Sequence, residues 1–244
     1  MSQQPFQFKK FKVHQDRCAM KVGTDGVLLG AWSSIEHEPK SILDIGAGTG
    51  VVALQLAQRS SASTIDAIEI DDQAHEQCTH NFENSDWADR LFCYHASVQE
   101  FASEMEHKYD LIESNPPCFK APKSTGSQTQ NTSQERAVAR FTDTLPFKHL
   151  VVCAAHLLSQ NGVFCTILPH KEADSFIEIA AQNKLFISKI CTIRGIKTSK
   201  IKRCLLAFST RQSKPKTQEL TIEISRHNYT QEYKNLVSDF YVKM

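Results

Sequence analysis

The chain has 244 residues, of which 41% are hydrophobic, and this is enough apolar material for one sizeable core. Its 28 Lys and Arg are balanced by 27 Asp and Glu, which excludes binding to an acidic partner through bulk charge and requires a local basic patch instead. The eight cysteines form no C-x-x-C pair, and no apolar run approaches the ~20 residues that span a bilayer, so we expect a soluble cytoplasmic protein with reduced thiols and no metal site.

The first half of the chain alternates short β-branched apolar runs with helical patterns. A parallel connection between strands needs a helix to return the chain, so this rhythm predicts a parallel sheet with helices on both faces. Strands are expected at residues 41–45, 64–70, 90–96 and 109–114, with helices at residues 51–59, 71–82 and 98–105.

The second half continues this pattern and then departs from it. A long helix over residues 142–160, ended by Asn161 and Gly162, precedes a strand at 163–169 and a helix at 171–183. Two closing runs predict an antiparallel pair that caps the sheet edge, and the tail adds a short strand and a helix. These last elements are expected at residues 185–194, 203–210, 220–225 and 229–242.

Residues 120–134, KAPKSTGSQTQNTSQ, contain no apolar side chain larger than alanine or proline and are rich in Ser, Thr and Gln. This composition predicts a mobile loop. It is either a disordered insertion or a loop that covers the substrate, and its attachment directly behind the segment ESNPPCF favours the second interpretation.

The segment LDIGAGTG places Gly46, Gly48 and Gly50 between a predicted strand and a predicted helix, where a tight turn lets a ligand lie against the backbone. A dinucleotide fingerprint would put its third glycine at Val51, so NAD is the weaker candidate. A tight loop alone could account for the glycines. However, Glu69 follows about 20 residues later at the end of the next strand, where a carboxylate can accept hydrogen bonds from both ribose hydroxyls or simply be solvated.

The segment ESNPPCFK ends another predicted strand with Asn115, Pro116 and Pro117. Proline fixes its own φ angle and donates no backbone hydrogen bond, so the carbonyl groups at this corner are held in place without ladder partners. The corner can therefore present acceptors to a ligand. The alternative is a Pro-Pro turn that only stops the strand.

These motifs resemble known ones. Asp44 and the three glycines match D-x-G-x-G-x-G, the first motif of class I S-adenosylmethionine-dependent methyltransferases, and residues 115–117 resemble the N-P-P-[YF] motif of enzymes that methylate planar, amide-like nitrogens. Together with KVGTDGVLLGAW (residues 21–32) and the late RCLLAF, they resemble the bacterial tRNA1(Val) adenine-37 N6-methyltransferases over nearly the whole chain. The resemblance implies S-adenosylmethionine as cofactor and tRNA as partner.

The same resemblance implies a Rossmann-like α/β fold: a mostly parallel, seven-stranded twisted sheet with helices on both faces and an antiparallel last strand. We expect a single methyltransferase domain over residues 1–244, and a monomer. Within it, residues 1–35 complete the cofactor and RNA site, residues 36–212 form the catalytic core, and residues 213–244 pack on that core.

The resemblance also implies how the corner acts. The amide oxygen of Asn115 and the carbonyl of Pro116 accept the two hydrogens of the adenine amine and orient its nitrogen, while Pro117 adds rigidity. Cys118 departs from the family motif, which has an aromatic residue here that stacks on the target base. Phe119 is a candidate replacement, although adjacent side chains in extended backbone point to opposite sides. A reactive thiol at Cys118 is the other interpretation.

Further cofactor contacts follow from the resemblance alone. Lys21 or Thr24 is expected to meet the methionine carboxylate, and the helix beginning at Asp25 would close over it, although Asp25 can equally be a plain helix N-cap. Ser97 stands where many relatives carry an aspartate that accepts from the cofactor's adenine amine, so this contact is either weaker or left to the backbone.

Two basic clusters are candidates for contacts with RNA phosphates. One lies in a predicted turn between the last two long strands, and the other alternates with phenylalanine near the N-terminus. A charge run is more often a solvated surface, so the methyltransferase resemblance is what favours RNA binding here. With two arginines beyond the mobile loop, the candidates are Lys9, Lys10, Lys12, Arg136, Arg140, Arg194, Lys197, Lys200, Lys202 and Arg203.

The leading hypothesis is a tRNA adenine-N6 methyltransferase. A glutamine-N5 protein methyltransferase would use the same N-P-P geometry, but the chain lacks a separate helical substrate domain. The third hypothesis is a protein that binds S-adenosylmethionine and RNA with weak catalysis, because Cys118 replaces the usual aromatic residue.

Overall fold

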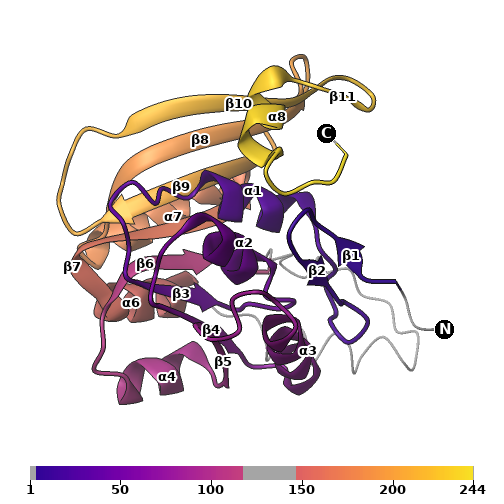
Figure 1. Cartoon of the computed structure of the whole chain (residues 1–244). Coiled ribbons are helices and arrows are strands. Elements are labelled where there is room, and N and C mark those ends of the chain that lie inside the picture. Colours follow the sequence, from indigo (N-terminus) through magenta and orange to yellow (C-terminus); the bar gives the residue numbers. More distant parts are fainter. Residues whose placement is uncertain (1–3, 118–146, 244) are drawn as a thin grey trace, which may run out of the picture.

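The computed structural model describes residues 4–117 and 147–243. Its main element is a nine-stranded sheet with the order β11-β10-β8-β9-β7-β6-β3-β4-β5 (Figure 1). The strands are β3 (Ser41–Ile45), β4 (Thr64–Glu69), β5 (Leu91–His95), β6 (Tyr109–Ser114), β7 (Leu158–Pro169), β8 (Phe186–Ile196), β9 (Arg203–Ser209), β10 (Lys216–Ser225) and β11 (Asn228–Tyr229). The helices are α1 (Thr24–Trp32), α2 (Val51–Arg59), α3 (Asp72–Glu83), α4 (Val98–Glu104), α6 (Phe147–Leu157), α7 (His170–Gln182) and α8 (Gln231–Val237).

The sheet is mostly parallel, as predicted. β3 pairs in parallel with β4 and β6, and the parallel pairing continues to β5 on one side and β7 on the other. β9 runs antiparallel between β7 and β8. The carboxyl ends of β3, β4, β6, β7 and β8 therefore lie along one edge of the sheet, which is where open α/β sheets bind ligands.

Helices cover both faces of the sheet, which confirms the predicted layers. α1, α2, α3 and α8 contribute to one apolar cluster, which includes Phe8, Trp32, Leu54 and Val237. α4, α6 and α7 contribute to a second cluster on the opposite face, where the rings of Phe164 and Phe208 stack 5.9 Å apart. The two clusters together bury the sheet on both sides.

Three predictions about the second half of the chain were wrong. α6 ends at Leu157, because Leu158 is buried and already pairs with Tyr109 of β6 at the start of β7. Gly162 lies within this strand beside a register shift, and a Cβ there would come within 2.9 Å of the Tyr109 carbonyl oxygen. The glycine thus marks an irregularity in a strand rather than the end of a helix.

The second error concerns the sheet edge. β10 is ten residues long and adds in parallel to β8, so the antiparallel pair of β8 and β9 lies inside the sheet and β11 forms the edge. The seven expected strands are thereby extended to nine. The third error is the last helix, since α8 covers only Gln231–Val237.

A small N-terminal hairpin of β1 (Phe6–Gln7) and β2 (Lys12–Val13) was not anticipated. Phe8 is fully buried, its ring lies 4.6 Å from that of Phe11, and its backbone forms a bridge with Tyr241. Residues from near the two ends of the chain therefore pack together (Figure 1). The phenylalanines of the segment FKKFK serve this packing.

Candidate functional site

Hydrogen bonds fasten three neighbouring strand ends to one another at the carboxyl edge of the sheet. The Ser114 hydroxyl at the end of β6 donates to the carbonyl of Ile45 at the end of β3 (2.9 Å). The amides of Gly46 and Ala47 donate to the carbonyl of Ile68 in β4, at 2.9 and 3.1 Å. The glycine loop (residues 46–50), the tip of β4 and the corner of residues 115–117 therefore lie side by side.

All three glycines of the loop adopt left-handed backbone angles, with φ of 73°, 55° and 76° at Gly46, Gly48 and Gly50. A Cβ added at Gly46 or Gly48 would meet no described atom within 4 Å, so both face open space. A Cβ at Gly50 would lie 2.6 Å from the ring of Phe82 and 2.8 Å from the sulfur of Cys78. Gly46 and Gly48 thus leave room for a ligand, whereas Gly50 allows α3 to pack closely.

Glu69 braces this loop. Its Oε2 accepts a 2.8 Å hydrogen bond from the Gly48 amide, and its Oε1 accepts from the amides of Ile70 and Asp71 at 2.8 and 3.0 Å. The sequence placed Glu69 at a strand tip near the glycines, and the structure puts it there. Its expected contact with ribose hydroxyls stays a prediction.

Asp44 is a buried acid directly below the glycine loop, with only 1% of its surface exposed. Its Oδ2 accepts from the Ala53 amide at 3.3 Å, while its Oδ1 is buried without a hydrogen-bond partner among the described residues. Burial, together with the charge of Glu69, raises the pKa of Asp44 to about 7. A buried acceptor lacking a partner beside an open glycine loop fits a ligand that carries donors or positive charge, as the cationic S-adenosylmethionine does.

The corner after β6 is held against α1. Pro116 is buried and Asn115 is half-buried. A Cβ on Gly26 of α1 would lie 3.7 Å from Asn115 Nδ2 and 3.3 Å from a methyl group of Val51, the first residue of α2. Gly26 therefore allows Asn115 to approach the start of the helix that follows the glycine loop. Cys118 and Phe119 lie outside the described residues.

The structure corrects the interpretation of Asp25 as a helix cap. Gly23 occupies the N-cap position of α1, so Asp25 falls in the first turn, where its carboxylate pairs with Arg203 at 2.7 Å. This ion pair fastens the start of α1 to β9. Lys21 and Thr24 are exposed just before and at the beginning of α1, and their contact with a methionine carboxylate stays a prediction.

Ser97 caps α4 beside the tip of β4. Its hydroxyl accepts from the Glu100 amide (3.2 Å), and the Ser97 amide donates to the Glu100 carboxylate (3.0 Å), which completes a capping box. The Ala96 amide donates to the carbonyl of Glu69 at 3.2 Å, so Ser97 is close to the ligand edge. Its expected contact with the cofactor's adenine amine stays a prediction.

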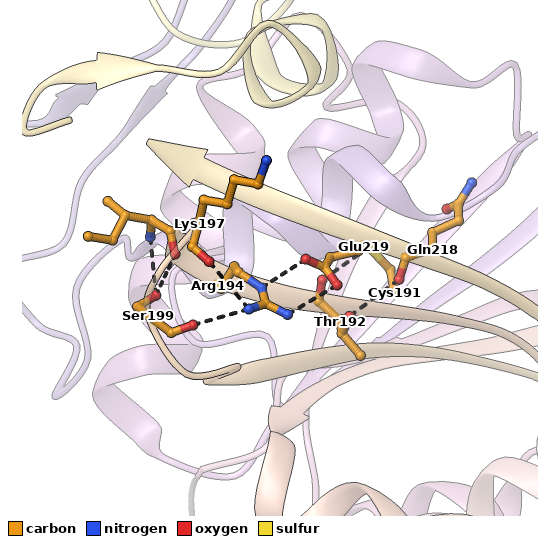
Figure 2. Close-up of polar contacts among 8 residues, drawn as sticks. Cys191, Thr192, Arg194, Lys197, Ser199, Gln218 and Glu219 are labelled. Atoms are coloured by element: carbon orange, nitrogen blue, oxygen red, sulfur yellow. Dashed lines mark hydrogen bonds and ion pairs between the residues drawn. The ribbon is translucent and has the colours of Figure 1, made fainter. Parts of the chain in front are cut away.

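The basic turn of residues 197–202 lies on the same edge of the sheet, because β8 runs parallel to β10 and in the direction of β7. Arg194 braces this turn by binding Glu219 through Nε and Nη2, at 2.9 and 3.1 Å, and by donating to the Ser199 carbonyl at 3.3 Å (Figure 2). Lys197, Lys200 and Lys202 are exposed.

The N-terminal basic residues lie elsewhere. Lys9 Nζ donates to the Ser238 carbonyl at 2.6 Å, and Lys9 and Lys10 line a cavity of 480 Å³ with Gln58 and Arg59. This cavity is at the end of α2 opposite the glycine loop, about 13 Å away along a nine-residue helix. Lys12 is exposed, and Arg136 and Arg140 lie outside the described residues.

Two contacts that build the site were missed in the sequence: the hydroxyl of Ser114 and the close approach at Gly26. The polar run Glu113-Ser114-Asn115 at the end of a largely apolar strand was the available signal for the first. Within residues 4–117 and 147–243, no group of His, Cys, Asp and Glu is arranged to hold a metal ion. The helices of the same residues include none with the length and apolar character of a membrane-spanning segment.

Residues 26–172, more than half of the chain, match the family model described as the methyltransferase small domain. Among solved structures, the fold is similar to a predicted O-methyltransferase from Agrobacterium tumefaciens, with a TM-score of 0.67 and 16% identity over 88% of this chain and 96% of that chain. A putative RNA methyltransferase from Pyrococcus horikoshii gives a TM-score of 0.52 and 17% identity, over 75% and 80% of the two chains. These likenesses confirm the Rossmann-like methyltransferase fold.

Sequence relatives are much more similar. The chain is 54% identical to a protein of Christiangramia forsetii over 100% of both chains, and 52% identical to one of Flavobacterium psychrophilum over 98% of this chain and 100% of the relative. A Parabacteroides distasonis protein is 44% identical over 98% of each. All three are named tRNA1(Val) (adenine(37)-N6)-methyltransferase. With this identity over its full length, the chain belongs to the family of the bacterial tRNA1(Val) (adenine(37)-N6)-methyltransferases.

Proposed function

We propose that the protein uses S-adenosylmethionine to methylate the N6 amine of an adenine in tRNA, namely A37 of tRNA1(Val), next to the anticodon. The family supports this function. The structural observation that carries it is the hydrogen bond from Ser114 to Ile45, because it places Asn115 beside the glycine loop that begins at Gly46. The two motifs thus open onto one shared edge of the sheet.

The cofactor, when bound, supplies a methyl group on a positively charged sulfur, which is already activated for transfer. Gly46 and Gly48 leave space for it, and the carboxylate of Glu69 lies at the strand tip where ribose hydroxyls would be bound. Asp44 supplies a buried negative charge whose Oδ1 has no hydrogen-bond partner among the described residues. These residues bind and orient the cofactor. Because the methyl group is already activated, the reaction requires no covalent nucleophile from the protein.

Asn115 and Pro116 orient the acceptor. The lone pair of an adenine amine is delocalised into the ring, so the nitrogen is a poor nucleophile. The amide oxygen of Asn115 and the carbonyl of Pro116 accept its two hydrogens and direct the lone pair toward the methyl group. The burial of Pro116 and the position of Asn115 close to Gly26 of α1 support both acceptors.

We also propose that Lys197, Lys200 and Lys202 contact phosphates of the tRNA. They are exposed, and they lie in a turn at the same edge of the sheet as Asn115. The ion pairs of Arg194 and Arg203 hold this turn and its neighbouring strand in place, so the two arginines support the turn. Lysine contacts to phosphate add affinity without sequence information.

The test is methyl transfer in solution. The purified protein is incubated with methyl-labelled S-adenosylmethionine and unmodified tRNA1(Val), and the RNA is digested to nucleosides. We expect label in N6-methyladenosine and none with Asn115→Ala, which should still bind S-adenosylhomocysteine. Label in a protein glutamine would indicate the glutamine-directed reaction instead, and cofactor binding without label in any nucleoside would indicate a binding protein.

A further inference from the structure

Glu113 is a buried carboxyl group two residues before Asn115, and none of its surface is exposed. Its Cα lies opposite those of Asp44 in β3 and Cys165 in β7, so the three residues form a row across adjacent strands. Asn115 follows the end of β6, and its Nδ2 lies 3.7 Å from the position that a Cβ on Gly26 of α1 would occupy, so Asn115 also lies close to α1. The N-P-P motif begins at Asn115, and no role was assigned to Glu113 from the sequence.

The two hydrogen-bond contacts of Ser33, at the end of α1, bear on the protonation state of Glu113. The Ser33 oxygen lies 2.8 Å from Glu113 Oε2 and 2.9 Å from the Leu29 carbonyl oxygen. Both of these neighbours are acceptors if Glu113 is ionised, yet a serine hydroxyl has one hydrogen to donate. Both contacts are satisfied if Glu113 carries a proton and donates it to Ser33, which in turn donates to Leu29.

Burial and the neighbouring carboxylate also favour the protonated form of Glu113. Burial is the main cause that raises the pKa of Glu113 well above its usual range, and the neighbouring Asp44 raises it further. Arg59 of α2 and Cys165 of β7 act in the opposite direction, as Ser33 would if it donated its hydrogen to an ionised Glu113. The Arg59 guanidinium is directed at backbone carbonyls, donating to Gly30 and Ser33 at 2.6 and 3.0 Å.

A further charge near this row belongs to Lys189 of β8, which opposes Ala207 in the strand next to Cys165. Its ammonium lies 4.5 Å above the ring of Trp32, so it is attracted to the aromatic face at the end of α1. Among the described residues, the titratable groups that face or adjoin Glu113 are thus Asp44 of β3, Arg59 of α2, Cys165 of β7 and Lys189 of β8.

We infer that Glu113 is a protonated carboxylic acid and acts as a positioning residue for methyl transfer. It donates to Ser33 and so fastens the last turn of α1 to β6, two residues before Asn115. Because it is neutral, Asp44 can carry the negative charge of the row without repulsion from a second buried carboxylate. The catalytic part of this inference rests on the proposed function, whereas the protonation state does not.

The consequence for activity is a loss at alkaline pH. When Glu113 releases its proton, the contact with Ser33 loses its donor and a second charge appears beside Asp44. The rate should therefore fall on the alkaline side. Glu113→Gln retains a donor for Ser33 and cannot ionise, so we expect it to keep kcat within about threefold of wild type near neutral pH and to lose the alkaline decline.

Glu113→Leu is the matched variant that removes the donor but keeps a similar volume. We expect a fall in kcat of about tenfold or more with a small change in the affinity for S-adenosylhomocysteine, because Asn115 is misplaced while the glycine loop is intact. If Glu113→Gln loses as much activity as Glu113→Leu, or if the alkaline decline persists in Glu113→Gln, the inference is wrong.

A direct measurement tests the protonation state without tRNA, and its central readout is taken on the wild-type protein. The protein is labelled with ¹³C at the glutamate side-chain carboxyls, so that Asp44 does not contribute, and titrated by NMR. We expect one glutamate carbon to keep the chemical shift of a protonated acid at neutral pH, and Glu113→Gln to remove that signal. If every glutamate carbon has the shift of a carboxylate at neutral pH, Glu113 is ionised and the inference fails, whatever substrate the enzyme methylates.

Discussion

Ser114 donates a 2.9 Å hydrogen bond to the carbonyl of Ile45, across the pair of strands that carry the two motifs of the site. Ser114 immediately precedes Asn115, and Ile45 immediately precedes Gly46. Both residues are buried, so water does not compete for this contact. Together with the parallel pairing of β3 and β6, this bond helps to fix the acceptor-orienting corner beside the cofactor loop.

Ser114→Ala should affect both stability and catalysis. Loss of one buried hydrogen bond is expected to lower the free energy of unfolding by about 1–2 kcal/mol. Because the corner is less well positioned, kcat should fall more than the affinity for S-adenosylhomocysteine. Urea unfolding and single-turnover kinetics measure the two effects. Ser103→Ala, which removes an exposed contact with the Glu100 carbonyl, is the control, and an equal effect of both variants would contradict the role of Ser114.

Gly48→Ala and Gly50→Ala should each impair the protein, but for different reasons. At Gly48 the added Cβ enters open space, so the cost is backbone strain of about 1–2 kcal/mol and obstruction of the cofactor. At Gly50 it collides with Phe82 and Cys78, so the loss of stability should be larger. Thermal unfolding and calorimetry with S-adenosylhomocysteine separate the two. Equal losses of stability would refute the distinction.

Asp44 should make cofactor binding depend on pH. Its pKa is raised to about 7, mainly by burial, and a cationic ligand favours the ionised form. Affinity for S-adenosylmethionine should therefore rise as the pH increases through about 7, by up to tenfold per pH unit below it. Titration calorimetry measures this, and 5′-methylthioadenosine, which lacks the positive charges, is the control ligand. An equal pH dependence for both ligands would exclude Asp44 as the cause.

The same acid gives a stability prediction with a defined sign. An acid whose pKa is raised by folding stabilises the native state below its unfolded value, near 4, and this stabilisation is lost as the pH rises through its folded value. Without cofactor, the free energy of unfolding should therefore decrease between about pH 4 and about pH 7. Asp44→Asn should remove this component, as measured by urea unfolding across the range. A parallel pH dependence in the variant would contradict the assignment.

Lys200 and Arg194 should behave differently although both belong to the basic cluster. Lys200→Gln removes an exposed charge, so tRNA affinity should weaken and the slope of log K against log salt should decrease by about one. Arg194→Gln removes the contacts with Glu219 and Ser199 and should lower stability. Binding titrations at several salt concentrations, with urea unfolding, distinguish them. A stable Arg194→Gln protein with a reduced salt slope would place Arg194 in the RNA contact instead.

Local patterns predicted the elements nearest the site. The apolar run SILDI and the helical pattern VVALQLAQR match β3 and α2 in both bounds. The residues of each segment favour its secondary structure locally, and the residues on either side mark where it begins and ends. The length of β10 and the start of β7 at Leu158 could not be predicted in this way. Both depend on pairing with strands that are distant in sequence, which periodicity does not encode.

The sequence predicted the main motifs of the candidate site but not the contacts that hold them in place. Glycines and prolines reveal their role through backbone constraints, so Gly48 and Pro116 were recognisable. Asp25 and Arg203 are 178 residues apart in the sequence, and only the folded chain shows that they form an ion pair. The burial of Glu113 could not be predicted for the same reason, since the residues that bury it are distant in the sequence.

The most direct test of the function is mass spectrometry of tRNA1(Val) from bacteria whose own gene for this protein is deleted. The gene is returned either intact or with Asn115→Ala, and the anticodon-loop fragment is sequenced. We expect N6-methyladenosine at A37 with the intact gene and unmodified adenosine at that position with the variant. Methylation at A37 that persists in the deletion strain or with Asn115→Ala would contradict the proposed function or the role of Asn115.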